Sequence, residues 1–258
     1  MKKKIVIVGT AHPYRGGLAV FNERLAKQWV AEGHEVEICT FTLQYPSMFF
    51  PGKTQYADWE APQGIHIQRK INSINPFNWI KQGFYIRKMA PDMLVFKFWM
   101  PFFAPCFGTL ARVAKWKRKV KVISVLDNVI PHEKRIGDSF LVSYFVKAVD
   151  GFIAMSKSVG DDLRVYDKKK PCLWSPHPLY DNFGKAISRD EALKQLGFDP
   201  SFRYLLFFGI IRRYKGLDLL LEAFADARLR NFKLKLIIAG EFYEDEKYFL
   251  DIVEKFRL

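Results

Sequence analysis

The chain alternates short apolar runs rich in β-branched residues with longer runs in which apolar residues recur at helical spacing. Lys4–Val8 has the pattern of a buried strand, and Leu18–Glu32 has that of an amphipathic helix ended by Gly33. The same pattern predicts further strands at Glu35–Thr40, Ile65–Ile71, Met93–Trp99, Val120–Leu126 and Phe152–Met155, and further helices at Pro76–Met89, Phe102–Trp116 and Ser156–Tyr166. Strands that alternate with helices form a parallel sheet covered on both faces, which is the α/β fold class.

The alternation breaks at residues 175–184, SPHPLYDNFG, which are rich in proline and turn-forming residues and are typical of a hinge. We therefore expect two Rossmann-like domains, at residues 1–180 and 181–258. In the second domain the pattern restarts, with strands at Arg203–Phe208 and Leu234–Ala239 and helices at Leu217–Ala227 and Glu244–Phe256. Because a nucleotide-binding α/β domain usually has about five or six strands, two strands predict a partial domain.

The charge of the chain narrows the kind of partner that it binds. Its 258 residues include 41 Lys and Arg against 27 Asp and Glu, a formal net charge of +14. Such an excess favours an acidic partner, and three classes fit: a nucleotide, a nucleic acid or an anionic membrane surface.

Cysteine usage and hydropathy indicate the compartment. Cys39, Cys106 and Cys172 are odd in number and far apart in the sequence, which is typical of reduced thiols. The apolar stretch at residues 93–111 is interrupted by Lys97 and two prolines, so we do not expect it to span a bilayer. We therefore expect a cytoplasmic protein, with peripheral binding to the inner membrane face as an option.

Three cations lie in the turn that follows the strand Arg203–Phe208. This turn, GIIRRYKG at residues 209–216, contains Arg212, Arg213 and Lys215. Ligands of open parallel sheets bind beyond the carboxyl ends of the strands, and a helix N-terminus already attracts anions. Like charges in this place cost free energy unless an anion binds among them, so a bound diphosphate is one interpretation. A solvated basic turn is the alternative.

Two further loops follow predicted strands. Gly16 and Gly17 begin the first helix and expose backbone N–H groups there, although their spacing from Gly9 does not match the dinucleotide-binding fingerprint. A turn that needs positive φ would explain the pair equally well.

The second loop follows the strand Val120–Leu126 and carries Asp127, Asn128 and His132. These polar groups open at the carboxyl edge of the sheet, where a substrate binds. His132 fits a catalytic role or a role in orienting the loop, and a lone histidine more often has the second.

The run KWKRKVK at residues 115–121 has five cations and one tryptophan. It fits the polar end of a helix that runs into a strand. It also fits contact with anionic lipid headgroups, for which Phe102, Phe103 and Trp116 would supply an apolar footing.

Four stretches, in this order, resemble the retaining family 4 glycosyltransferases of the GT-B fold. They are residues 13–40 (PYRGGLAVFNERLAKQWVAEGHEVEICT), 127–133 (DNVIPHE), 176–184 (PHPLYDNFG) and 207–224 (FFGIIRRYKGLDLLLEAF). The resemblance implies two Rossmann-like domains with a cleft, the first holding the acceptor and the second the nucleotide sugar. It also implies that the sugar nucleotide is a substrate and that neither a cofactor nor a metal ion is needed.

The resemblance assigns roles to residues of this chain. Arg212 and Lys215 match the residues that hold the donor diphosphate, and their charges would stabilise it as the glycosidic bond breaks. Gly16 and Gly17 match the loop that presents N–H groups to the donor. Relatives often have a histidine that contacts the donor sugar where this chain has Asp127. Asp127 and His132 are therefore the candidate catalytic residues, His132 as a substitute for that histidine. Further candidates for donor binding are Asn128 and Glu241.

We therefore expect transfer of a sugar from a nucleotide-sugar donor to an acceptor hydroxyl with retention, in polysaccharide or glycolipid synthesis. The expected acceptor is a carbohydrate or a lipid-linked molecule, and no nucleic acid is expected to bind. The alternative is a truncated, non-catalytic relative that acts as a basic binding protein for membrane or nucleic acid.

Overall fold

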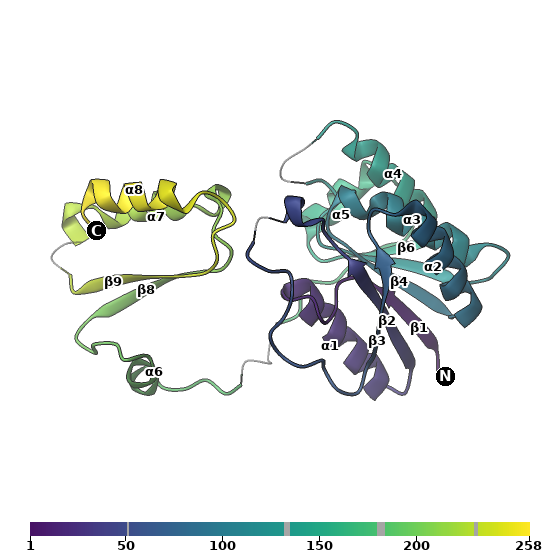
Figure 1. Ribbon diagram of the computed structural model, residues 1–258, viewed down its shortest axis with the longest axis horizontal. Coiled ribbons are helices and arrows are strands. Elements are labelled where there is room, and N and C mark those ends of the chain that lie inside the picture. The colour runs from purple at the N-terminus through teal and green to yellow at the C-terminus, as the bar shows by residue number, and fades with distance from the viewer. Residues whose placement is uncertain (51, 132–134, 180–183, 230–231) are drawn as a thin grey trace. The chain divides into compact units, whose positions relative to one another are not determined.

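The computed structural model describes residues 1–50, 52–131, 135–179, 184–229 and 232–258 (Figure 1). The chain divides into two compact units. The first unit comprises Met1–Ser47 and Gln55–Pro178, and the second comprises Met48–Thr54 and Leu179–Leu258. The short segment Met48–Thr54 thus belongs to the second unit although it lies within the sequence of the first.

The first unit is a seven-stranded sheet, in the order β3-β2-β1-β4-β5-β6-β7, in which every neighbouring pair is parallel. Its strands are β1 (Lys4–Val8), β2 (Glu35–Leu43), β3 (His66–Asn72), β4 (Met93–Phe98), β5 (Lys121–Leu126), β6 (Gly151–Ala154) and β7 (Cys172–Trp174). Its helices are α1 (Gly17–Ala31), α2 (Pro76–Met89), α3 (Ala104–Lys115), α4 (Asp138–Ala148) and α5 (Lys157–Arg164). Strand order reverses between β1 and β4, and in such sheets ligands bind beyond the carboxyl ends of the strands at that point.

Helices cover both faces of this sheet (Figure 1). On one face, Phe21 and Ala26 of α1 pack against strand residues such as Ile7. On the other, helices α2 to α5 pack against strand residues such as Phe96, and aromatic side chains including Phe107 fill the space between. Alternate residues of each strand therefore enter one core or the other, which is why the strands are apolar almost throughout.

The second unit contains a parallel pair of strands, β8 (Arg203–Phe208) and β9 (Leu234–Ala239). Its helices are α6 (Arg189–Leu196), α7 (Leu217–Phe224) and α8 (Glu246–Phe256). The core is small: Ile211, Leu217, Leu221 and Phe249 are buried, and partly buried side chains of β8 and β9 pack against them. The unit is a strand–helix–strand–helix arrangement of the Rossmann type, with the two strands that the sequence predicts.

The structure confirms the α/β class and most predicted elements, and it adds three. The helices α4 and α6 and the strand β7 were not predicted. The N-cap of α4 is Gly137, which gives no side-chain signal, and β7 has three residues, too few for a recognisable pattern. By contrast, α6 has a readable signal, because Ser188 and Glu191 form a capping box at its start.

One residue of the apolar footing predicted beside the basic run 115–121 does not lie at the surface. The side chain of Phe103 is buried. It lies in the 3₁₀ turn Pro101–Phe103 before α3 and contacts the rings of Phe41, Trp99 and Phe107. Phe102 is partly buried and packs against Phe103. The hydrophobic cluster that follows β4 therefore belongs to the core.

Candidate functional site

The turn between β8 and α7 is fixed by backbone contacts with the segment that follows β9. The N–H of Ile211 donates to the carbonyl of Glu241 (2.9 Å), and the N–H of Tyr243 donates to the carbonyl of Ile211 (3.1 Å). The side chain of Ile211 is buried in the core of the unit. Gly209 has a φ of 123°, a conformation that favours glycine. These contacts hold the backbone of the turn, and with it the basic side chains, against the segment that follows β9.

The three cations of this turn have different surroundings. The backbone N–H of Arg213 donates to Glu244 Oε2 (2.9 Å), and its guanidinium lies 4.0 Å from the ring centroid of Tyr248. Arg212 is half-buried, with its guanidinium 5.6 Å from the ring centroid of Tyr243, and Lys215 is exposed. Neither Arg212 nor Lys215 forms an ion pair within the described ranges. These two charges are thus available to an anion.

The first turn of α7 adds to this site. The helix begins after Gly216, which has a φ of 75° and offers no side-chain cap. The one carboxylate in the first turn, Asp218, accepts hydrogen bonds from the N–H of Leu219 (3.0 Å) and the hydroxyl of Tyr248 (3.2 Å). An uncapped helix start next to two cations favours an anionic ligand.

Glu241 lies in the same unit, in the segment that fixes the turn. Its carboxylate accepts a hydrogen bond from the backbone N–H of Lys53, which is in the segment Met48–Thr54. The same segment places Phe50 edge-on to Tyr243, with ring centroids 5.7 Å apart. Tyr243 therefore contacts both this segment and Arg212, whose guanidinium faces its ring.

In the first unit, Gly16 and Gly17 lie where α1 begins. Gly16 is the N-cap, has a φ of 107° and offers no side-chain hydrogen bond. No atom of the described structure lies within 4 Å of the position that a Cβ of Gly16 would occupy. The start of α1 is thus uncapped by any side chain and open, and its first turn has no acidic residue.

Asp127 follows β5 and forms an ion pair with a buried lysine. The Nζ of Lys97, on β4, lies 2.7 Å from Asp127 Oδ1, 2.9 Å from the sulfur of Met155 and 3.7 Å from the ring centroid of Phe21. The side chain of Lys97 is 2% exposed and that of Asp127 is 21% exposed. Burial lowers the pKa of Lys97 below its ordinary value, and the charge of Asp127 partly offsets this effect.

The second carboxylate oxygen of Asp127 takes no part in the ion pair with Lys97, which uses Oδ1. Oδ2 is buried and has no hydrogen-bond partner among the residues that the structure describes. Buried carboxylate oxygens normally accept hydrogen bonds, so an unpartnered one at the carboxyl edge of a sheet is suited to a donor group of a ligand.

The other candidates at this edge are less defined. Asn128 is half-buried and follows Asp127 directly. His132 lies outside the described residues. His177, in the predicted hinge, packs against Phe21 with ring centroids 5.7 Å apart.

The ion pair of Lys97 is not predicted from the sequence. In the sequence this lysine only interrupts an apolar stretch. The available signal was its position within a strand of apolar residues, because a buried charge requires a partner of opposite sign.

Three further observations bear on the chemistry of the molecule. Within the described ranges, no group of His, Cys, Asp and Glu has the arrangement of a metal site, and no helix is long and apolar enough to cross a membrane. The three cysteines are free thiols, and burial raises the pKa of Cys39 to about 12. A buried thiol with a raised pKa is a poor nucleophile.

Two family models match the chain. The model for glycosyltransferase family 4 matches residues 15–177, and that for glycosyl transferases group 1 matches residues 188–257. The matched segments lie in the first and second parts of the chain and leave residues 178–187 between them. None of the curated protein sequences matches the chain significantly.

Solved structures of the GT-B fold are similar to the chain. Sucrose-phosphate synthase from Thermosynechococcus elongatus has a TM-score of 0.73 at 13% identity, covering 99% of this chain and 68% of its own. Anabaena HepE, solved with UDP and glucose, has a TM-score of 0.69 at 12% identity, covering 99% and 67%. The catalytic domain of starch synthase IV from Arabidopsis thaliana, bound to ADP and acarbose, has a TM-score of 0.57 at 14% identity, covering 100% and 72%. At these identities the similarity establishes the shared fold.

Proposed function

Because the chain belongs to glycosyltransferase family 4 and is a glycosyltransferase, we propose that it transfers a sugar from a nucleotide-sugar donor to an acceptor hydroxyl with retention of configuration. The acceptor in this proposal is a carbohydrate or lipid-linked molecule, and the reaction serves polysaccharide or glycolipid synthesis. The donor is consumed as a substrate, and we propose that no separate cofactor takes part. The nucleotides in the structures of HepE and starch synthase IV support a nucleoside diphosphate as the carrier.

The observation that carries this proposal is the pair Arg212 and Lys215. They lie on a turn with a fixed backbone, beside the uncapped start of α7, and no carboxylate of the described structure neutralises them. As a glycosidic bond to a diphosphate breaks, negative charge develops on the leaving phosphate oxygens. Fixed cations stabilise that charge more in the transition state than in the ground state, which accelerates the reaction.

Four other residues have proposed roles in the same reaction. Gly16 and Gly17 present backbone N–H groups to the donor, because the start of α1 is uncapped by side chains and the space beside Gly16 is open. Asp127 accepts a hydrogen bond from a sugar hydroxyl through Oδ2, while Lys97 holds its other oxygen.

The remaining candidates rest on the family pattern and on position. Asn128 follows Asp127 and is placed to bind a sugar hydroxyl. Glu241 contributes to the donor side from the segment after β9. His132 is proposed from the sequence as an additional group near the donor sugar.

Titration calorimetry of the chain with UDP, ADP and UDP-glucose tests the role of the turn. Each charge-assisted hydrogen bond contributes about 1.5–3 kcal/mol, so replacing both Arg212 and Lys215 by alanine should weaken binding of the preferred nucleotide at least 100-fold. A matched control replaces Lys247 and Lys255, two exposed lysines of α8 in the same unit, and should leave the affinity within about twofold. Equal affinity of the wild-type and R212A/K215A chains would contradict the assignment.

Retention is tested on the product. The anomeric configuration of the transferred sugar, read from the proton coupling constant in a nuclear magnetic resonance spectrum, should equal that of the donor. An inverted product would overturn this part of the proposal and leave nucleotide binding unaffected.

A further inference from the structure

Positive charge is concentrated in one part of the first unit. Residues 61–126 contain twelve Lys and Arg and a single acidic residue, Asp92, and so account for eleven of the chain's fourteen excess positive charges. Asp92 is itself engaged, since its Oδ2 accepts a hydrogen bond from the N–H of Lys4 (2.8 Å). The strands β3, β4 and β5 and the helices α2 and α3 come from this segment, and α2 and α3 contain no carboxylate.

The outer side of α2 carries three large apolar side chains. Phe77 is 85% exposed, Ile80 45% and Phe84 40%, and they recur three and four residues apart, so they share one face of the helix. The opposite face is buried: a Cβ on Gly83 would lie 2.6 Å from Val113 of α3, which shows how closely the two helices pack. Three large side chains on one exposed face form a continuous feature, which differs from the scattered apolar residues of an ordinary surface.

Trp116, the residue after α3, extends this face. It is 54% exposed, and its ring lies against that of Phe84 with centroids 5.9 Å apart. Arg87 of α2 holds it in place: its Nε donates to the carbonyl of Trp116 (2.8 Å), and its guanidinium lies 5.6 Å from the indole centroid. We call Phe77, Ile80, Phe84 and Trp116 the α2 surface.

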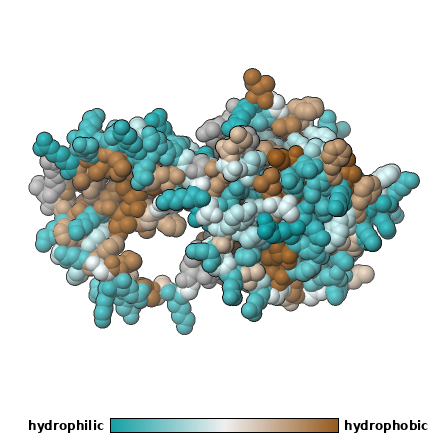
Figure 2. All heavy atoms as spheres, viewed as in Figure 1, coloured by the Kyte–Doolittle hydropathy of each residue, from teal (hydrophilic) through white to brown (hydrophobic). Residues whose placement is uncertain are grey.

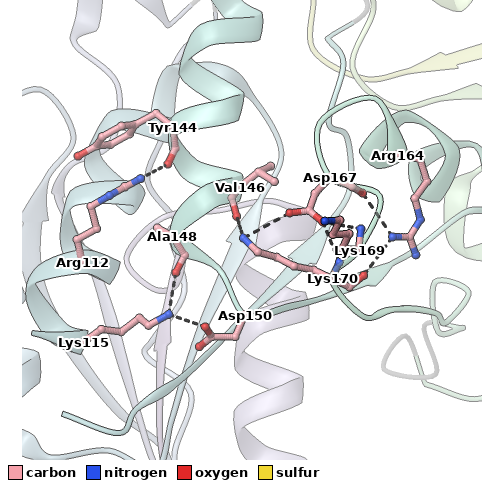
Figure 3. A network of polar contacts seen from close by, with 10 residues as sticks. All are labelled: Arg112, Lys115, Tyr144, Val146, Ala148, Asp150, Arg164, Asp167, Lys169 and Lys170. Carbon is pink, nitrogen blue, oxygen red and sulfur yellow. Dashed lines mark hydrogen bonds and ion pairs between the residues drawn. The ribbon is translucent and has the colours of Figure 1, made fainter. Parts of the chain in front are cut away.

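The structure divides the neighbouring cations into two groups. Lys115 donates to the carbonyl of Ala148 (3.3 Å) and to Asp150, and so caps the C-terminal end of α4 (Figure 3). Arg112 donates to the carbonyl of Tyr144 (2.7 Å), one turn earlier in the same helix. The second group is exposed and has no carboxylate partner in the described structure; it comprises Lys81 and Lys88 of α2 and Lys117, Arg118 and Lys119 after Trp116.

We propose that the α2 surface docks the protein onto an anionic lipid bilayer. The four apolar side chains would enter the boundary between headgroups and acyl chains, and the five exposed cations would contact lipid phosphates. Two features favour a membrane over a nucleic acid or a protein. First, transfer of the Ile80 side chain to an apolar medium is favourable, whereas this side chain cannot stack on nucleic-acid bases. Second, a surface without carboxylates has no group that can pair with the basic residues of a protein partner.

This inference is independent of the proposed transfer reaction. The α2 surface shares no residue with the turn at Arg212 and Lys215, so nucleotide binding and membrane binding succeed or fail separately. If both hold, the acceptor of the reaction is presented at the membrane.

Flotation with vesicles tests the proposal on the whole chain. The chain should float with vesicles of equal parts phosphatidylcholine and phosphatidylglycerol, and remain below vesicles of phosphatidylcholine alone. Raising the salt to about 1 M, where the Debye length is about 3 Å, should reduce the bound fraction several-fold. Equal binding to the two kinds of vesicle, or binding to neither, would overturn the proposal.

Matched variants identify the surface. Phe77→Ser combined with Phe84→Ser should lower the partition coefficient at least tenfold, whereas Phe140→Ser, at a phenylalanine of α4 that is 76% exposed, should not change it. Lys117→Gln combined with Arg118→Gln should lower it about tenfold, whereas the same change of charge at Lys168 and Lys169, exposed after α5, should lower it less than twofold.

The same variants exclude other surfaces and partners. Equal losses in the control and α2 variants would show that binding is set by net charge alone, and would overturn the assignment to this surface. An experiment with mixed-sequence RNA gives a further outcome. The proposal would be overturned if this RNA displaced the chain from anionic vesicles and if the F77S/F84S variant lost as much affinity for the RNA as for the vesicles.

Discussion

In the first unit helices lie on both faces of the sheet, whereas in the second unit α7 and α8 pack on one side of the β8–β9 pair. The consequence is visible in two strands of equal length. Five of the six residues of β4 are buried, whereas none of the six residues of β8 is. Leu206 is 62% exposed and Phe208 81%. Figure 2 shows hydrophobic residues of the second unit reaching the surface between its helices and strands.

The sequences of the two strands are similar, and the difference in their burial comes from the parts of the chain that pack on them. Met93–Phe98 (MLVFKF) and Arg203–Phe208 (RYLLFF) are both apolar runs of the kind found in sheets buried on both faces. Apolar side chains stabilise a fold only where other parts of the chain remove them from water. The free energy of unfolding should therefore depend strongly on side chains of β4 and its neighbours, and weakly on the outward side chains of β8.

The largest expected effect contrasts two phenylalanines. Phe107→Ala, in the fully buried cluster between the sheet and α3, should lower the free energy of unfolding of the first unit by about 4 kcal/mol. Phe208→Ala, at an exposed position of β8, should change that of the second unit by less than about 0.5 kcal/mol. Comparable losses at the two positions would show that β8 is covered on both faces in solution.

The distribution of tryptophan allows the units to be followed separately. All six tryptophans of the chain lie within the residue ranges of the first unit. Tryptophan fluorescence during urea unfolding therefore reports the first unit alone, whereas far-ultraviolet circular dichroism reports both. A transition seen by circular dichroism and not by fluorescence belongs to the second unit.

The next effect concerns the ion pair between Lys97 of β4 and Asp127, the residue that follows β5. Lys97→Met leaves Asp127 without its partner and should cost about 3 kcal/mol, measured by fluorescence in urea. Adding Asp127→Asn removes the uncompensated charge, so the double variant should return to within about 1 kcal/mol of the wild type. A single variant as stable as the wild type would show that the pair is absent in solution.

The pH dependence of this pair has a definite sign. Burial lowers the pKa of Lys97 below its ordinary value of 10.5, so the folded chain loses this proton at a lower pH than the unfolded chain. Between those two pKa values the unfolded state binds more protons, and stability rises with pH. The stability of the wild type relative to the double variant should therefore increase as the pH approaches 10.5.

The smallest effect compares helix caps in the two units. The hydroxyl of Ser156 accepts a hydrogen bond from the N–H of Val159 at the start of α5, and that of Ser188 accepts one from the N–H of Glu191 in α6. Replacing either serine by alanine should cost about 1 kcal/mol, read by fluorescence for Ser156 and by circular dichroism for Ser188.

The contributions of these two caps to stability should respond differently to low pH. Hydrogen bonds from the backbone N–H and hydroxyl of Ser188 lower the pKa of Glu191 below its ordinary value of 4.5. The contribution of the Glu191 carboxylate is complete above pH 4.5 and is lost as the pH falls through the folded pKa. The cost of Ser188→Ala should therefore shrink in acid, and that of Ser156→Ala should not. Parallel pH curves would contradict the capping box.

Much of the fold could be predicted from the sequence. The bounds of β8, β9 and α2 match the predicted ranges, because periodic apolar residues and a proline at the start of α2 are local signals. The sequence missed α4 and β7, where the first turn has no side-chain cap or the strand is too short to show a period. Elements without a strong local signal form because neighbouring elements bury them.

The candidate site, like the fold, could be predicted from the sequence only in part. The sequence singled out Arg212, Lys215, Gly16 and Gly17 because glycines and cations at strand-to-helix turns favour anions, and their roles stay predictions until nucleotide binding is measured. It did not separate Arg213 from its neighbours, and it did not connect Lys97 with Asp127. Both distinctions depend on partners about thirty residues away in the sequence.

By itself the sequence determined the α/β alternation, the two-domain order and the positions of the charged turns, since periodicity and turn chemistry act over a few neighbouring residues. The tertiary structure decided which of these side chains remain free. In the folded chain Phe103 is buried, whereas Phe77 is exposed. Lys115 caps α4, whereas Lys117 remains exposed. The physical reason is that burial and ion pairing are set by groups brought close in space, whatever their separation along the chain.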